Sequence, residues 1–169
     1  KIKAILNTHH HFDHTAGNLE LKKISNCEVF ASYLSKDKIN GFSKGLSAKA
    51  DMNLDGYKIE VLETPGHTLD ALSYYIPQAN VLFSGDTLFS MGCGRIFEGS
   101  AELMWKSLKK IISLPDNTLV YPGHEYTLNN LLFALSLEPD NIDLQIYYKK
   151  VKDLLKKNRP SIPSFLGDE

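Results

Sequence analysis

Four potential metal ligands lie within six residues near the start of the chain, and this cluster constrains the chain more than any other feature. They are His9, His11, Asp13 and His14, in the sequence THHHFDH. The cluster follows an apolar run over 2–6 and precedes a stretch with helical spacing from about Ala16. Imidazole nitrogens combined with a carboxylate oxygen suit zinc, iron or manganese. Because no thiolate lies nearby, the cluster predicts an open, catalytic metal site rather than a closed structural zinc site.

Three further candidate ligands follow at wide spacing, each in a loop directly after a strand-like apolar run. They are His67 in TPGHT, Asp86 in SGDT and His124 in PGHE. Glycine or proline flanks each of them, which lets the backbone approach closely and fixes the turn. An extended segment can direct the first two histidines of the cluster to one metal, whereas Asp13 and His14 lie past the bend. Since two metals need more than four ligands, the three loop residues complete a two-metal site.

The composition indicates an ordinary soluble globular protein. A chain of 169 residues suits one domain, or one domain with a small appendage, and 43% of its residues are hydrophobic. A formal net charge of -1 argues against nucleic-acid binding, because phosphate neutralisation needs a concentrated basic face. No apolar stretch approaches the roughly 20 residues of a transmembrane helix, so we expect no membrane span.

The two cysteines, Cys27 and Cys93, do not form a disulfide framework and favour a reducing compartment, so we expect a cytoplasmic protein. An organelle stays open, because the chain starts at Lys1 in an apolar run and reads as if entered part-way through a domain. The missing targeting peptide therefore carries no information. Cys93 lies between two glycines without a local base, which favours a small buried turn residue over a nucleophile.

Apolar runs separated by turn residues predict strands in the first three-quarters of the chain. The predicted strands cover 2–6, 27–31, 57–62, 72–76, 81–83 and 119–121, with a hairpin between 72–76 and 81–83. Helical spacing covers 103–112, with Ser100 as its N-cap. This part predicts a mixed α/β domain over residues 1–126.

Beyond residue 126 the apolar spacing is helical only. It covers 128–135 and, after a break at Pro139, 142–155. The spacing predicts a helical C-terminal extension over 127–169. We expect this extension to contribute to the substrate site.

The seven candidate ligands resemble the metal box of the metallo-β-lactamase superfamily. Further strings are similar to glyoxalase II, the hydroxyacylglutathione hydrolase family. They are GDTLF at 85–89, GCGR and FEG within 92–99, GHEYT at 123–127 followed by NL at 130–131 and FA at 133–134, and PSIPSFL at 160–166, in which Phe165 replaces the family's threonine. The resemblance therefore extends from one end of the chain to the other.

The resemblance implies an αββα sandwich, of which the first strands precede Lys1 in the family and are missing here. It also implies two divalent metal ions, with zinc expected and iron or manganese open. The implied ligands are His9, His11 and His67 for one ion and Asp13, His14 and His124 for the other, with Asp86 as the bridge. The ions would activate a water molecule, which Asp86 orients with help from Asp13.

The implied reaction is hydrolysis of the thioester S-D-lactoylglutathione to glutathione and D-lactate, a step of methylglyoxal detoxification. Arg95, Phe97 and Tyr126 match the family's substrate-binding positions, although Phe97 lacks the hydroxyl of relatives that have tyrosine there. The family's further basic groups for glutathione lie beyond Glu169. We expect a monomer whose partner is this small molecule.

Two alternatives stay open. A persulfide dioxygenase resembles the same metal box but uses a single iron and oxygen, and the string Glu125-Tyr126-Thr127 together with the helical extension favours the hydrolase. A thiol-binding module without turnover is the second alternative. His10 lies between two ligands on an extended stretch, so we expect it to point away from them and to make a supporting hydrogen bond.

Overall fold

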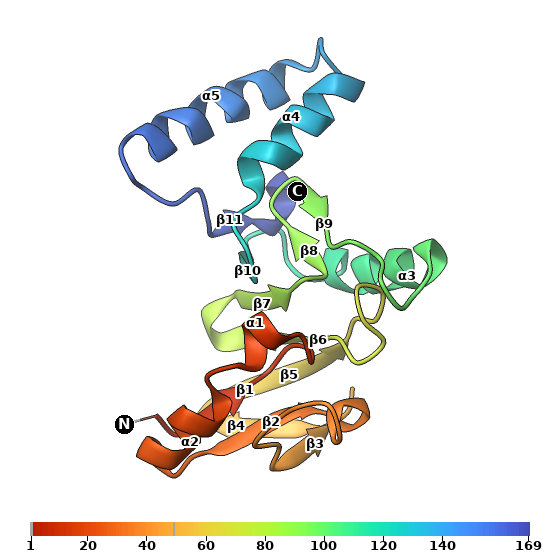
Figure 1. The fold of residues 1–169 in the computed structure, drawn as a ribbon. Helices are drawn as coiled ribbons and strands as arrows, with labels where there is room; N and C mark the ends of the chain where they lie inside the picture. Colours follow the sequence, from red (N-terminus) through yellow and green to blue (C-terminus); the bar gives the residue numbers. More distant parts are fainter. Residues whose placement is uncertain (1, 49) are drawn as a thin grey trace.

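Two β-sheets packed against each other form the centre of the protein (Figure 1). The computed structural model describes residues 2–48 and 50–169. In this part of the chain the smaller sheet is parallel, with the order β1 (Ala4–Leu6), β2 (Glu28–Ser32) and β3 (Lys44–Leu46). The larger sheet has the order β11 (Ser164–Phe165), β10 (Leu119–Pro122), β7 (Val81–Gly85), β6 (Leu72–Ile76), β5 (Tyr57–Glu63) and β4 (Asp51–Leu54). β8 (Leu88–Phe89) and β9 (Gly92–Cys93) form a separate ribbon.

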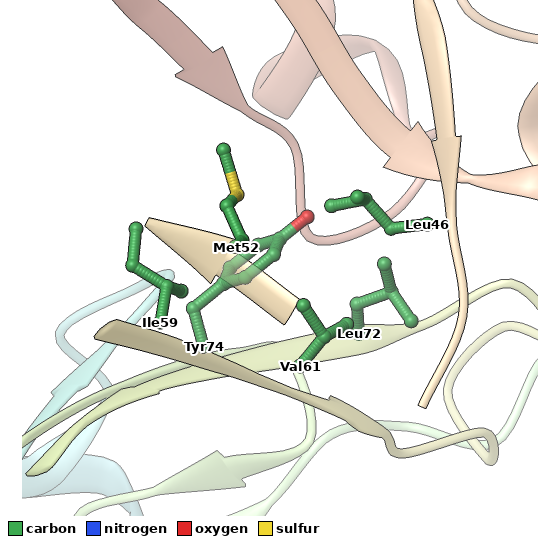
Figure 2. Packing of buried hydrophobic residues seen from close by; sticks show 6 residues of the cluster. All are labelled: Leu46, Met52, Ile59, Val61, Leu72 and Tyr74. Atoms are coloured by element: carbon green, nitrogen blue, oxygen red, sulfur yellow. The ribbon is translucent and has the colours of Figure 1, made fainter. Parts of the chain in front are cut away.

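The space between the sheets is filled by apolar side chains that alternate along the strands, as the period of two requires. On β5, Ile59 and Val61 point into this space, whereas Leu62 packs on the opposite face of the sheet. Figure 2 shows the six buried members of the cluster: Leu46, Met52, Ile59, Val61, Leu72 and Tyr74. Burying each large apolar side chain stabilises the fold by roughly 1.5–3 kcal/mol, so this layer fixes how the sheets face each other.

Helix α3 (Ala101–Ile112) covers the outer face of the larger sheet. Its Ile111 packs with Leu82 of β7 and Val120 of β10, all of them fully buried. The helix begins where the sequence predicts, because the Ser100 hydroxyl accepts a hydrogen bond from the Leu103 N–H at 3.2 Å. The predicted N-cap is therefore confirmed.

The remaining α-helices lie at the two ends of the described chain. Near the N-terminus, α1 (Phe12–Thr15) and α2 (Asn18–Ser25) follow β1 and lead into β2. Helices α4 (Thr127–Leu137) and α5 (Ile142–Lys156) pair with each other apart from the sheets and are drawn in cyan and blue in Figure 1. No helix within residues 2–48 and 50–169 is both long and apolar enough to cross a membrane.

The predicted α/β body with C-terminal helices is confirmed, and each predicted strand is present with bounds shifted by at most two residues. The prediction of helix alone beyond residue 126 was wrong in one respect, because β11 pairs with β10. Its side chains are a serine and a phenylalanine, too short a run for a periodic signal. The short strands β3, β4, β8 and β9 were also missed.

Candidate metal centre and active site

The sheet topology brings the predicted ligands to one edge of the molecule. β5 and β7 are each antiparallel to β6, and β10 is parallel to β7, so the carboxyl ends of β5, β7 and β10 share one edge. The loops after these three strands carry His67, Asp86 and His124. The segment after β1 joins them there, because the Leu72 N–H donates to the Thr8 carbonyl at 2.7 Å.

One group of nitrogen atoms comes from three imidazoles. His9 Nε2 and His67 Nε2 each lie 3.0 Å from His11 Nδ1. Nitrogen ligands lie about 2.0–2.1 Å from zinc, so those around one tetrahedral ion are about 3.3 Å apart. The three nitrogen atoms therefore have a spacing close to that of a single metal site.

A second group combines a carboxylate with two imidazoles. His124 Nε2 lies 3.2 Å from both His14 Nε2 and Asp13 Oδ2. Asp86 lies between the groups: its Oδ1 is 3.4 Å from His14 Nε2, and its Oδ2 is 3.5 Å from both His67 Nε2 and His124 Nε2. The structure thus brings all seven predicted ligands together, in two groups that share one carboxylate.

The Asp86 carboxylate is better placed to bind a cation than to accept a hydrogen bond from another protein group. Its Oδ1 is buried and has no hydrogen-bond partner among the described residues. Burying a carboxylate oxygen without a partner costs folding free energy. A cation bound to this oxygen would offset that cost. Glycine is needed nearby, because a Cβ at Gly123 would collide with this oxygen and one at Gly94 would collide with the Asp86 carbonyl. The residues therefore fit a metal ion.

A neighbouring carbonyl fixes the tautomer of one imidazole. His67 Nδ1 lies 2.6 Å from the Arg95 carbonyl, which can only accept, so Nδ1 donates and Nε2 keeps its lone pair in the neutral ring. His67 thus offers a nitrogen lone pair to the first group. His9 Nδ1 lies 3.1 Å from Thr8 Oγ1, so its other ring nitrogen, Nε2, is the one directed at His11.

Electrostatics keep this group in the form that binds metals. Burial, followed by the imidazoles of His14 and His11, lowers the pKa of His9 to about 2. Burial and then the neighbouring His67 also lower the pKa of His11. Since metals bind neutral imidazole, the site is ready for a cation at neutral pH.

A cavity of about 440 Å³ opens beside the two groups. The predicted substrate residues Arg95, Phe97 and Tyr126 line it together with five of the ligands. Phe97 lies edge-on to His67, with ring centroids 5.2 Å apart, and the Arg95 guanidinium lies 5.7 Å from the Phe97 ring. Tyr126 stacks on His124 at 5.1 Å. The cavity therefore combines a cationic side chain, aromatic surfaces and the candidate metal site.

Sequence reasoning assigned no role to two further residues of the cavity, Phe89 and Asn130. The Phe89 ring contacts Tyr126 edge-on at 5.2 Å, and Asn130 Nδ2 donates to the Ser90 carbonyl at 3.0 Å. Both residues belong to the family-like strings, which was their only sequence signal. They support the shape of the cavity around Tyr126.

The structure bears on the predictions for two residues near the ligands. His10 forms a hydrogen bond outside the seven-ligand cluster, with its Nδ1 2.7 Å from Asp70 Oδ1, so the predicted supporting bond is confirmed. The prediction of a buried turn residue at Cys93 was wrong, because Cys93 is exposed and lies in strand β9 at the cavity. Desolvation raises the pKa of its thiol, which disfavours the thiolate and a nucleophilic role.

Two family models match the chain along its length. Residues 1–124 match the model of the metallo-beta-lactamase superfamily. The chain belongs to this superfamily. Residues 125–169 match the model of the hydroxyacylglutathione hydrolase C-terminus, so the resemblance noted from the sequence strings is confirmed.

Curated relatives of this superfamily member carry the name hydroxyacylglutathione hydrolase. The protein from Bartonella tribocorum is 48% identical over 168 residues, and that from Rhodospirillum rubrum is 45% identical over 168 residues. Each alignment covers 99% of this chain and 66% of the relative. The chain therefore spans just under two thirds of the length of these relatives.

Solved structures confirm the predicted fold class. ETHE1 from Myxococcus xanthus matches with a TM-score of 0.65 and 33% identity, over 73% of this chain and 54% of that one. The BLEG-1 B3 metallo-beta-lactamase matches with a TM-score of 0.64 and 29% identity, over 72% of this chain and 69% of that one. The metallo-β-lactamase architecture thus extends over nearly three quarters of the chain.

Proposed function

We propose that the chain is the catalytic part of a hydroxyacylglutathione hydrolase, which converts S-D-lactoylglutathione and water into glutathione and D-lactate. The observation that carries the proposal is the convergence of seven ligand side chains beside a cavity with Arg95 and Tyr126. Identity of 45–48% to hydrolases over nearly the whole chain supports the thioester as substrate. The match of residues 125–169 to the hydrolase C-terminus favours this reaction over an oxygenase or a binding module.

We propose two divalent ions, with zinc expected and iron or manganese also compatible with the ligands. His9, His11 and His67 would hold one ion, Asp13, His14 and His124 the other, and Asp86 would contact both. When bound, such ions lower the pKa of a water molecule toward ~7 and polarise a carbonyl group.

The chain's own residues then orient the reactants. Asp86 sets the spacing of the two ligand groups, because each of its oxygens faces one or both of them. Asp13 is 59% exposed at the rim of the cavity, where its carboxylate can accept a hydrogen bond from the attacking water. A thiolate is a good leaving group, so the reaction needs no strong general acid from the chain.

Glutathione is held by residues at the cavity wall in this proposal. The Arg95 guanidinium pairs with a carboxylate of the tripeptide, and the Tyr126 hydroxyl contacts its peptide part. Phe97 supplies an apolar surface next to the imidazoles of His11 and His67. These contacts lie away from the scissile bond, so they serve binding more than the chemical step.

The decisive experiment follows the loss of thioester absorbance of S-D-lactoylglutathione with metal-loaded protein and a chelator-treated control. We expect turnover that the chelator abolishes. Protein that holds two metals without turnover would contradict the hydrolase. Oxygen consumption with a persulfide would instead identify a dioxygenase, and glutathione binding without either reaction would identify a binding module.

The molecular context is proposed from the sequence. We propose a cytoplasmic monomer that binds neither nucleic acid nor membranes, with a boundary between its two parts at residues 126 and 127. Support for the boundary comes from α4, which begins at Thr127, and from the change of family model at residue 125. Light scattering of the purified protein tests the monomer.

A further inference from the structure

A buried hydrogen-bonded pair lies directly beside the candidate metal centre. His10 Nδ1 is 2.7 Å from Asp70 Oδ1, and the Asp70 side chain has an exposed fraction of 0%. His10 stands between His9 and His11 in the chain, and Asp70 follows His67 by three residues. The pair therefore connects the two segments that supply the three imidazoles of the first ligand group.

The Asp70 carboxylate is fixed from its other side by the smaller sheet. Ser35, at the end of the short helix η1 (Tyr33–Ser35) after β2, is fully buried and donates its hydroxyl to Asp70 Oδ2. Although burial raises the pKa of Asp70, its polar neighbours Ser35, Thr68 and His10 hold it below its usual value. A buried carboxylate is costly unless it is hydrogen-bonded, so the bonds from Ser35 and His10 offset this cost and help to fix its direction.

The pair adds an attachment point near the middle of the ligand segment. The Leu72 N–H holds the start of the segment at the Thr8 carbonyl, and Asn7 Nδ2 holds its end by donating to the His14 carbonyl at 3.0 Å. Between these points, His10 is attached through Asp70. The pair therefore restrains how the imidazoles of His9 and His11 face His67.

Glu98 extends the connection to the loop that carries the substrate residues. Its Oε2 accepts a hydrogen bond from the Leu69 N–H at 2.8 Å, and its Oε1 lies 3.7 Å from His10 Nε2 and 3.6 Å from Lys38 Nζ. Glu98 therefore lies near Nε2 of the His10 ring, while Asp70 is bonded to Nδ1. The bond to Asp70 restrains rotation of the ring about its bond to Cβ.

We propose that His10 and Asp70 form a positioning pair, which holds His9 and His11 at the correct angle to His67 without touching metal or substrate. The inference rests on the proposed function only in that these three imidazoles hold a metal ion. No role at this position follows from the match to the superfamily.

The test measures Zn²⁺ affinity by competition with a chromophoric chelator. We expect His10→Ala and Asp70→Ala each to weaken binding by ~10- to 100-fold, the usual effect of removing a residue behind a metal ligand. The double variant should lose no more Zn²⁺ affinity than either single variant, because each single substitution already removes the same hydrogen bond. His10→Asn places an amide donor near the position of Nδ1 and should recover most of the affinity.

Val29→Ala is the matched control, since Val29 lies in β2 and is fully buried in the apolar cluster on the outer face of the smaller sheet, with no polar group in its side chain. It should lower the free energy of unfolding without changing Zn²⁺ affinity. Unchanged affinity in His10→Ala, or additive losses in the double variant, would overturn the positioning pair alone. A chain that binds no Zn²⁺ would overturn the metal site as well, whereas binding without thioester turnover leaves the pair intact and removes the hydrolase.

Discussion

At the scale of single residues, Asp86 carries the greatest consequence, because one carboxylate faces both ligand groups. We expect Asp86→Ala to lower kcat/KM for the thioester by more than about 100-fold, beyond the effect typical of residues behind a ligand. Steady-state kinetics of zinc-loaded protein measure this. Asp153→Ala, on the exposed surface of α5, is the control and should behave like the unsubstituted protein. Near-full activity of Asp86→Ala would exclude the two-metal site.

Arg95 combines two roles at one residue, and a substitution separates them. Its carbonyl accepts the hydrogen bond from His67 Nδ1, whereas its guanidinium lines the cavity. Arg95→Ala keeps the carbonyl, so we expect KM to rise by about 10-fold or more while kcat changes little, the signature of lost uniform binding. Arg95→Lys keeps the positive charge, so its KM should lie between that of the unsubstituted protein and that of Arg95→Ala. A fall in kcat alone would argue against contact with the substrate's carboxylate.

At the scale of elements, Glu125 ties the C-terminal segment to the loop that carries His124 and Tyr126. Its Oε1 accepts hydrogen bonds from the Ser161 N–H at 2.5 Å and from the Ser161 hydroxyl at 2.6 Å. We expect Glu125→Ala to lower the free energy of unfolding by about 1–3 kcal/mol, measured with urea, because the Ser161 N–H loses its acceptor and the buried Ser161 hydroxyl keeps only Thr127 Oγ1. Glu125→Gln keeps an acceptor oxygen, so its free energy of unfolding should fall by less than that of Glu125→Ala. Equal stability of both variants and the unsubstituted chain would contradict this tie.

The elements also mark the limit of what the sequence predicts. β5 alternates buried and more exposed residues, and β6 is a short run buried on both faces, so the positions of both strands follow from local pattern. β3, with the sequence KGL, and β11 have no such pattern and depend on pairing with β2 and β10. The candidate ligands could be predicted because each lies in a short local pattern of histidine or aspartate with glycine or proline nearby. The role of Asp70 could not be predicted, because its bond to His10 spans 60 residues.

At the scale of the whole molecule, the candidate metals connect loops that lie between residues 9 and 124, so their binding should stabilise the folded chain. The fold itself rests on apolar clusters that lie apart from the ligands, which predicts that the metal-free protein stays folded at lower stability. Free Zn²⁺ at 100 times the dissociation constant adds about 2.7 kcal/mol if only the folded state binds. For a chain of this size that corresponds to a rise in Tm of roughly 5–10 °C.

Thermal unfolding followed by circular dichroism, with and without a chelator, measures this rise in Tm. The rise in Tm caused by Zn²⁺ should be smaller in Asp86→Ala than in the unsubstituted protein, because one carboxylate serves both ligand groups. It should persist in Arg95→Ala, because the Arg95 side chain binds no metal. An equal rise in the unsubstituted protein and in Asp86→Ala would mean that Zn²⁺ binds elsewhere on the chain. The seven-ligand centre would then be wrong even if the fold and the thioesterase activity were right.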